Sequence, residues 1–239
     1  MRPYDRDDAP RCGRCGTCCR KGGPTLQAED AALVAEGVLP LASLVTLRLF
    51  ELAWDEAQGR LRPQPRETVK VRGTGEAAFP WHCIFHRADS LCGIHERRPA
   101  QCRALLCRDT RPLEALYAQG QIGRAEVLAA LPLRPGWLEL AQAHEESCGV
   151  ERMVRLAVEA WRGPEGGRRA AAEALGGMLR QDAAFRALCV ERAGIAREEL
   201  PFLLGRPLAE LLEGTGLAAE PQGAEGWRLH RAGRCLYDL

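Results

Sequence analysis

The feature that most constrains this chain is a run of four cysteines within eight residues, Cys-Gly-Arg-Cys-Gly-Thr-Cys-Cys, which contains Cys12, Cys15, Cys18 and Cys19. A two-residue gap between cysteines lets a tight loop direct two sulfur atoms at one metal ion. Gly13 and Gly16 allow the backbone to curl toward those sulfurs. Residues 1–24 contain little that could form a hydrophobic core, so we expect this segment to depend on ligand bonds for its order.

The cellular compartment decides whether the 11 cysteines of this 239-residue chain form disulfides or bind metal. Residues 1–10 do not match a secretory leader, because charged side chains stand where a leader has its apolar core: Arg2, Asp5, Arg6, Asp7 and Asp8. No apolar run approaches the roughly 20 residues of a membrane-spanning helix. We therefore expect a cytoplasmic protein whose cysteines bind metal.

Composition narrows the class of partner. Hydrophobic residues make up 46% of the chain and charged residues 27%, which is typical of a globular protein. The formal net charge of +1 gives no overall attraction to nucleic acid or to an acidic membrane. The partners predicted are a metal ion or cluster and, as a further option, another protein, with no nucleic acid and no membrane.

The first part of the chain predicts few regular elements. Thr25 is a candidate helix cap, with Gly37 as the stop, and a second helix is expected over Leu41–Ala57. Alternating Val and charged residues over Glu67–Arg72 predict a short strand. A hairpin is expected from Cys83–Phe85 and Leu91–Ile94.

From Pro112 to Leu212 the apolar spacing predicts helices separated by Pro and Gly, over 112–119, 124–131, 136–146, 150–161, 167–180, 182–193 and 207–213. Two β-like runs follow, Gly216–Ala219 and Trp227–His230. The fold class predicted is mainly α with minor β: a cysteine-rich metal-binding half with a small β-hairpin, wrapped by and followed by a helical half. We divide it into residues 1–150 and 151–239, packed as one compact unit.

A second group of cysteines lies in the segment from Cys83 to Arg103, and it contains Cys83-Ile-Phe, Cys92-Gly-Ile-His and Arg98-Pro-Ala-Gln-Cys102-Arg. Together with the N-terminal run, these motifs resemble the YkgJ-type cysteine-cluster family, whose members are described as zinc- or iron-chelating. Ile84 and His95 depart from the Pro and Tyr of the family pattern, but neither change removes a thiolate. The resemblance covers roughly residues 10–150 and includes Cys148-Gly149.

The resemblance implies eight metal ligands, Cys12, Cys15, Cys18, Cys19, Cys83, Cys92, Cys102 and Cys148. Eight thiolates would complete two four-cysteine sites. Adjacent residues usually direct their side chains apart, which favours Cys18 and Cys19 serving two metals or bridging a cluster. Cysteine-only ligation suits an iron–sulfur cluster and zinc alike, so both cofactors stay open.

Other residues near the clusters have plainer interpretations. Cys189 lies among apolar residues of an expected helix and is interpreted as a small buried side chain, while Cys107 is a spare ligand candidate. His82, His86 and His95 flank the second group, and His95 is the best histidine ligand candidate. Pro99 is expected to begin a short helix that carries Cys102 in its first turn and lowers its proton affinity.

The function predicted is a metal-binding cysteine-cluster protein with a redox, metal-handling or structural role. Two alternatives stay open. Flagellin lysine methylases are similar in carrying the same cysteine motif, which makes a methyl-transfer enzyme one of them. The other is a zinc-stabilised module whose C-terminal helices bind a protein. The sequence predicts neither a reaction nor a catalytic residue.

Overall fold

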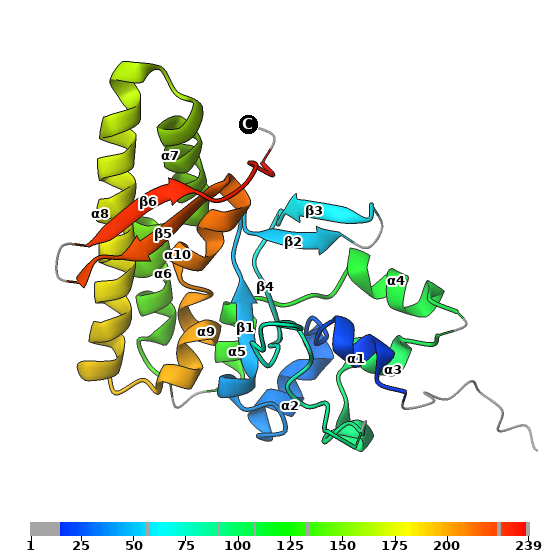
Figure 1. Cartoon of the computed structure of the whole chain (residues 1–239). Helices are drawn as coiled ribbons and strands as arrows, with labels where there is room; N and C mark the ends of the chain where they lie inside the picture. Colours follow the sequence, from blue (N-terminus) through cyan, green and yellow to red (C-terminus); the bar gives the residue numbers. More distant parts are fainter. Residues whose placement is uncertain are drawn as a thin grey trace, which may run out of the picture. The chain divides into compact units, whose positions relative to one another are not determined.

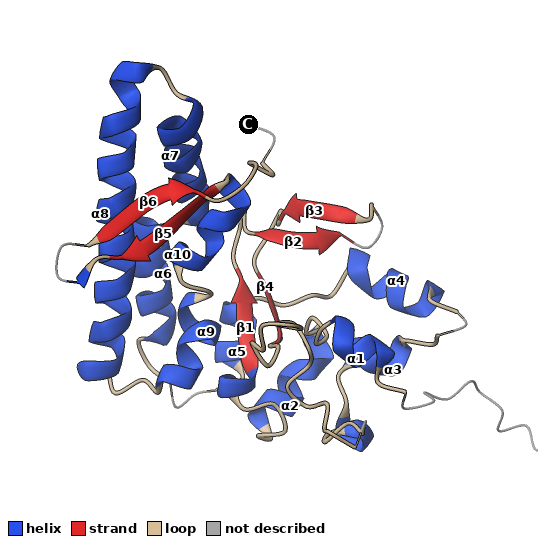
Figure 2. Ribbon diagram, viewed as in Figure 1, coloured by secondary structure: helices blue, strands red, loops and turns tan. Residues whose placement is uncertain are grey.

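The computed structural model describes residues 15–55, 58–89, 91–107, 109–131, 134–223 and 226–237. The chain forms two compact units: unit 1 comprises Met1–Leu44 and Val69–Leu131, and unit 2 comprises Val45–Thr68 and Pro132–Leu239. Helices predominate and strands are short and few, which confirms the predicted fold class of mainly α with minor β (Figure 2). The division at residue 150 stays a prediction about the extent of the metal-binding region.

Unit 2 is built on five helices of the described chain, α6 (Trp137–Cys148), α7 (Val150–Arg162), α8 (Glu165–Glu191), α9 (Leu200–Leu204) and α10 (Leu208–Leu211). Helices α7 and α8 lie side by side (Figure 1). Their facing sides bury Met153, Val154, Leu175 and Leu179 in one apolar core. None of the described helices has the length and apolar character of a membrane span.

The separate helices predicted over 167–180 and 182–193 are one helix, α8. The sequence between them contains no Pro or Gly that would interrupt it. Asp182 favours helix ends in isolation, but here its side chain is buried and hydrogen-bonded to His144. Its hydrogen bond to another helix therefore stabilises Asp182 in the middle of α8, where the sequence pattern predicts a helix boundary.

Two antiparallel hairpins complete unit 2. Strand β2 (Leu52–Asp55) pairs with β3 (Arg60–Pro63), with Leu52 opposite Pro63. Strand β5 (Leu217–Pro221) pairs with β6 (Trp227–Arg231), which confirms the two β-like runs predicted at the tail.

The helix predicted over Leu41–Ala57 is wrong. A 3₁₀ turn (Leu41–Ser43) leads into strand β1 (Leu44–Leu47), and β2 follows. All four residues of β1 are buried, and a strand covered on both sides shows a continuous apolar run in place of alternation. Strand β1 pairs with β4 (Thr68–Val71), and the presence of β4 confirms the strand predicted over Glu67–Arg72.

Unit 1 has shorter elements, α1 (Thr17–Lys21), α2 (Ala31–Ala35), α3 (Ala100–Ala104), α4 (Arg111–Ala118) and α5 (Arg124–Ala129). Its apolar core is small and includes Leu26, Val34, Leu39, Val71 and Val127.

The helix expected after Thr25 begins later than predicted. Gln27 caps a 3₁₀ turn (Ala28–Asp30) that leads into α2, and the Gln27 N–H donates to the Asp30 carboxylate at 2.9 Å. Asp30 also accepts a hydrogen bond from the N–H of Ala100 at 2.9 Å. This buried carboxylate therefore fixes the start of α3 against the start of α2.

The arms of the hairpin predicted from Cys83–Phe85 and Leu91–Ile94 do pair antiparallel, through a bridge of His86 with Cys92 and a bond from the Gly93 N–H to the Phe85 carbonyl at 2.8 Å. The pairing is an isolated bridge, and the described residues of this segment form no strand. The segment offers no alternating apolar face that a strand could bury.

Candidate metal centre

The N-terminal cysteines of unit 1 lie on and beside helix α1. Gly16 precedes the helix with a φ of +73°, a left-handed conformation that glycine adopts readily. Cys18 and Cys19 occupy the helix and are half-buried, while Cys15 precedes it and is exposed. Cys12 lies outside the described residues.

The second group of cysteines comes from the chain between β4 and α3. The N–H of Cys83 donates to the carbonyl of Cys19 at 2.8 Å, which joins the two groups directly. Cys92 is brought back toward this segment by its bridge with His86. Cys102 is the third residue of α3. Segments some sixty residues apart in sequence therefore meet in one region of unit 1.

The thiols of this region are close enough to perturb one another. Burial raises the pKa of Cys102 well above its usual range, and the nearby Cys83, Cys18 and Cys92 raise it further. Burial also raises the pKa of Cys83, and Cys92 and Cys18 add to that rise. Four thiols, Cys18, Cys83, Cys92 and Cys102, thus form an interacting set, which we call the thiol cluster.

Cys18 and Cys19 do not point apart, contrary to the expectation for adjacent residues. Their side chains share a hydrogen bond, which lowers the pKa of Cys18 to about 6 and raises that of Cys19. A short helical turn ends with Arg20 and Lys21, and Arg20 also favours the Cys18 thiolate. Cys18 therefore loses its proton more readily than Cys83 or Cys102, whose pKa values are raised.

The predicted position of Cys102, in a short helix after Pro99, is confirmed. The prediction that this helix lowers the pKa of Cys102 is wrong. Helix α3 begins at Ala100, directly after Pro99, and carries Cys102 in its first turn. Pro99 caps the helix and does not occupy its first position. Burial and neighbouring thiols outweigh any stabilisation by the helix end, so that the pKa of Cys102 rises.

The spacing of the thiol cluster bears on the metal. Tetrahedral zinc with Zn–S bonds of about 2.3 Å brings its sulfur ligands within about 3.8 Å of one another. Among the described residues, the only set of three or more candidate ligand atoms within 4.8 Å of one another is His144, Cys148 and Asp182 in unit 2. No three thiols of the thiol cluster form such a set in the described part of the chain.

Two further observations fit this region to a metal or cluster. The Nε2 atom of His86 is buried and lacks a hydrogen-bond partner. A Cβ atom at Gly16 would clash with that Nε2 atom, so glycine makes room for the imidazole ring beside helix α1. A buried nitrogen without a partner close to several cysteines fits a metal site, and thiolates are ligands for both iron and zinc.

His95, the histidine favoured on sequence grounds, has other partners. Its Nδ1 atom lies 3.0 Å from the Glu96 carboxylate, and the Arg98 guanidinium lies 3.2 Å from its Nε2. Of the three histidines that flank the second group of cysteines, His86 is the one whose ring has a buried nitrogen without a hydrogen-bond partner. The signal that could have singled it out is its spacing, since Cys83-Ile-Phe-His86 repeats the two-residue gap of the N-terminal cysteines.

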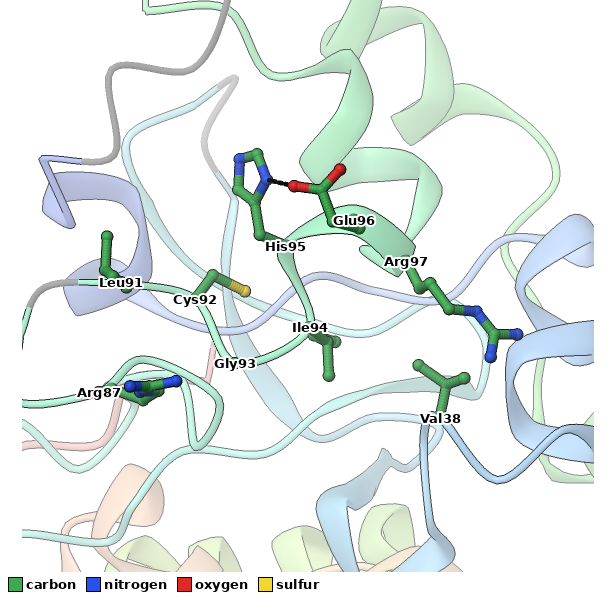
Figure 3. A pocket seen from close by; sticks show the side chains of 9 residues that line it. All are labelled: Val38, Arg87, Leu91, Cys92, Gly93, Ile94, His95, Glu96 and Arg97. Carbon is green, nitrogen blue, oxygen red and sulfur yellow. Dashed lines mark hydrogen bonds and ion pairs between the residues drawn. The ribbon is translucent and has the colours of Figure 1, made fainter.

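A hollow of about 360 Å³ opens beside Cys92, within the size range of small-molecule sites. Figure 3 shows Cys92, Gly93, Ile94 and His95 along one stretch of its wall, with the His95–Glu96 contact at the rim. Val38, Leu91 and Ile94 give the hollow an apolar part, and the charged side chains of Arg87, Glu96 and Arg97 line the rest.

Cys148 lies in unit 2, where its surroundings differ from those of the thiol cluster. It is buried at the end of α6, one turn after His144. The Nε2 atom of His144 lies 2.7 Å from the Asp182 carboxylate, which also accepts bonds from Arg186 at 2.9 Å and the Leu208 N–H at 3.0 Å.

The charges around Cys148 do not favour a cation. Arg48 is fully buried and donates to the Cys148 carbonyl at 2.5 Å and to Glu145 at 2.6 Å. Asp182 is already paired with Arg186, so its carboxylate is not free for a metal. His144, Cys148 and Asp182 are thus held in a hydrogen-bonded network, and ligation by Cys148 stays a prediction.

The remaining cysteines differ in exposure. Cys189 is buried on α8, which confirms its interpretation as a small core residue. Cys107 is exposed, and Cys235 is half-buried with its Sγ atom 3.6 Å from the Tyr237 carbonyl.

Comparison with known protein families agrees with this geometry. Residues 11–115 match the family model CxxCxxCC, described as "Putative zinc- or iron-chelating domain". No curated protein and no solved structure matched the chain. The match confirms the resemblance expected from the cysteine motifs. Residues 11–115 are therefore similar to the domains of this family, and the match supports a metal-binding role for this part of the chain.

Proposed function

We propose that unit 1 holds an iron–sulfur cluster through cysteine thiolates, as a structural and redox centre. The thiol cluster of Cys18, Cys83, Cys92 and Cys102 supplies the main ligands. Cys12, Cys15 and Cys19 lie on the same motif and are additional candidates. The eighth predicted ligand, Cys148, belongs to a separate site in this proposal, because its partners of known position all lie in unit 2.

The observation that carries the proposal is the spacing of the thiol cluster. Its members perturb one another's pKa, so they are neighbours, yet no three of them lie within 4.8 Å of one another. In a [4Fe–4S] cluster each thiolate binds a different iron atom, which holds the sulfur ligands further apart than one zinc ion does. This supports a cluster over a single zinc ion.

The charges of unit 1 support the same assignment. Thiolates around a cluster leave a net negative charge that nearby cations stabilise. Arg20 favours the Cys18 thiolate, and Arg98 favours that of Cys102. The Arg98 Nε atom also donates to the Cys102 carbonyl at 3.3 Å, which fixes the guanidinium beside α3.

Anaerobic purification of the full chain tests the proposal, with an optical spectrum and assays of iron, zinc and acid-labile sulfide. We expect iron and sulfide in similar amounts and broad visible absorption. In Cys92→Ser both should fall by at least half, because a ligand is lost. Cys235→Ser, outside the matched domain, is the control and should keep the parent content. Zinc without sulfide in the parent chain would overturn the cluster assignment.

A further inference from the structure

His86 lies where three cysteine-bearing segments of unit 1 meet. Its N–H donates to the Cys83 carbonyl at 2.9 Å, so that Cys83-Ile-Phe-His86 forms a tight turn. It pairs with Cys92 through an isolated bridge. Its imidazole ring lies against Gly16, a residue that stands between Cys15 and Cys18 in the sequence.

The two ring nitrogens of His86 have different surroundings. Nδ1 lies 2.6 Å from the Nε2 atom of His82, so one of the two donates a hydrogen bond to the other. Nε2 is buried and has no partner. A buried polar atom without a partner costs about 1–3 kcal/mol, so the structure should supply a reason for it.

From this geometry we infer that His86 is a nitrogen ligand of the metal centre, binding through Nε2. Metal-bound histidines commonly donate their second ring N–H to an acceptor that fixes the ring, and His82 is placed to accept that bond from Nδ1. The turn from Cys83 then directs a thiolate and an imidazole at the same centre. The centre is a mixed thiolate and imidazole site.

The inference requires a glycine at position 16, because the His86 ring lies against it. A side chain at position 16 would place Cβ on the Nε2 atom of His86 and push the ring away. Gly75 is a matched control in the same unit, because it has a similar φ of +77° but nothing within 4 Å of the position of its Cβ. Gly16→Ala should therefore lose the nitrogen ligand, whereas Gly75→Ala should keep it.

The inference rests on the proposed function, because it requires a metal in unit 1, and X-ray absorption spectroscopy separates the two. The measurement uses the anaerobically purified full chain, at the edge of whichever metal, iron or zinc, the chain contains. Nitrogen ligands scatter from about 2.0 Å and sulfur ligands from about 2.3 Å. We expect one nitrogen per centre in the parent chain and in His95→Ala, and none in His86→Ala.

The nitrogen signal would also disappear if His86→Ala no longer bound the metal, so His86→Cys is measured as a second variant. It should keep the metal, with a sulfur ligand in place of the nitrogen ligand. A parent spectrum with sulfur alone overturns the inference while the proposed function stands. A nitrogen shell that persists in His86→Cys, or that disappears in His95→Ala, also overturns it. A parent chain without metal overturns the proposed function, and the inference with it.

Discussion

The segment from Arg72 to Arg98 in unit 1 and the pair of helices α7 and α8 in unit 2 are ordered by different means. Among the described residues of 72–98, only Cys83 is buried, and regular structure is limited to one 3₁₀ turn. The α7–α8 pair buries Met153, Leu175 and Leu179 almost completely. Apolar burial orders the second segment, and we expect the first to depend instead on bonds to the proposed metal centre.

Removing two ligands should have the largest effect and should be confined to unit 1. In Cys83→Ser/Cys102→Ser we expect loss of metal and rapid proteolysis within residues 72–98, because metal binding to structural thiolates contributes on the order of 10 kcal/mol. The helices of unit 2 should resist the protease as in the parent chain. Cleavage sites mapped by mass spectrometry check this, and simultaneous cleavage in α8 would show that the two units are not independent.

Removing the buried carboxylate of unit 2 should have the next largest effect. Asp182→Ala removes the acceptor of the Leu208 N–H, the carboxylate partner of His144 and the only carboxylate that pairs with Arg186 among the described residues; Arg186 keeps its bonds to the carbonyls of Leu204, Gly205 and Arg206. Breaking a buried charged pair typically costs about 3–5 kcal/mol, which we expect in the free energy of unfolding of unit 2 measured with denaturant. Metal content should not change. A loss below about 1 kcal/mol would contradict the role given to this network.

Core truncation compares the two regions directly. Leu175→Ala removes a fully buried side chain from α8 and should lower the stability of unit 2 by about 2–5 kcal/mol. Ile84→Ala removes a half-buried side chain from the metal-dependent segment and should cost less than about 1 kcal/mol. Equal losses in the two variants would mean that apolar packing orders residues 72–98 after all.

The smallest effect is expected for a surface ion pair beside the thiol cluster. Glu29 accepts from Arg103 of α3 at 2.7 Å, and both side chains are exposed. Exposed pairs contribute about 0–1 kcal/mol, so Glu29→Ala should change neither stability nor metal retention measurably. A marked loss of metal in this variant would show that α3 is held by its surface charges and not by Cys102.

Within unit 2 the sequence predicted some elements better than others, for a physical reason. Helices α6 and α7 and the tail hairpin follow from apolar spacing and from Gly and Pro breakers. The misread segment, β1, is a fully buried strand whose continuous apolar run gives no period to distinguish it from a helix. The predicted helix boundary next to Asp182 was wrong, because the bonds that hold its side chain come from residues far away in the sequence, His144 and Leu208.

Cysteine positions in the metal region could be predicted because thiol spacing reflects ligand geometry directly. For His86 the sequence offered only the two-residue gap after Cys83, because the contacts that distinguish it from His82 and His95, with Gly16 and His82, depend on the folded chain. The acidity expected for Cys102 was wrong for a related reason. A helix start is visible in the sequence, whereas the burial and neighbouring thiols that dominate its pKa are not.

Hydrogen exchange of the full chain, with metal and after its removal by a chelator under reducing conditions, tests the central contrast most directly. Peptides covering residues 72–98 should lose their protection when the metal is removed, whereas peptides from α7 and α8 should exchange at unchanged rates. Protection of residues 72–98 that survives complete removal of the metal would contradict the account.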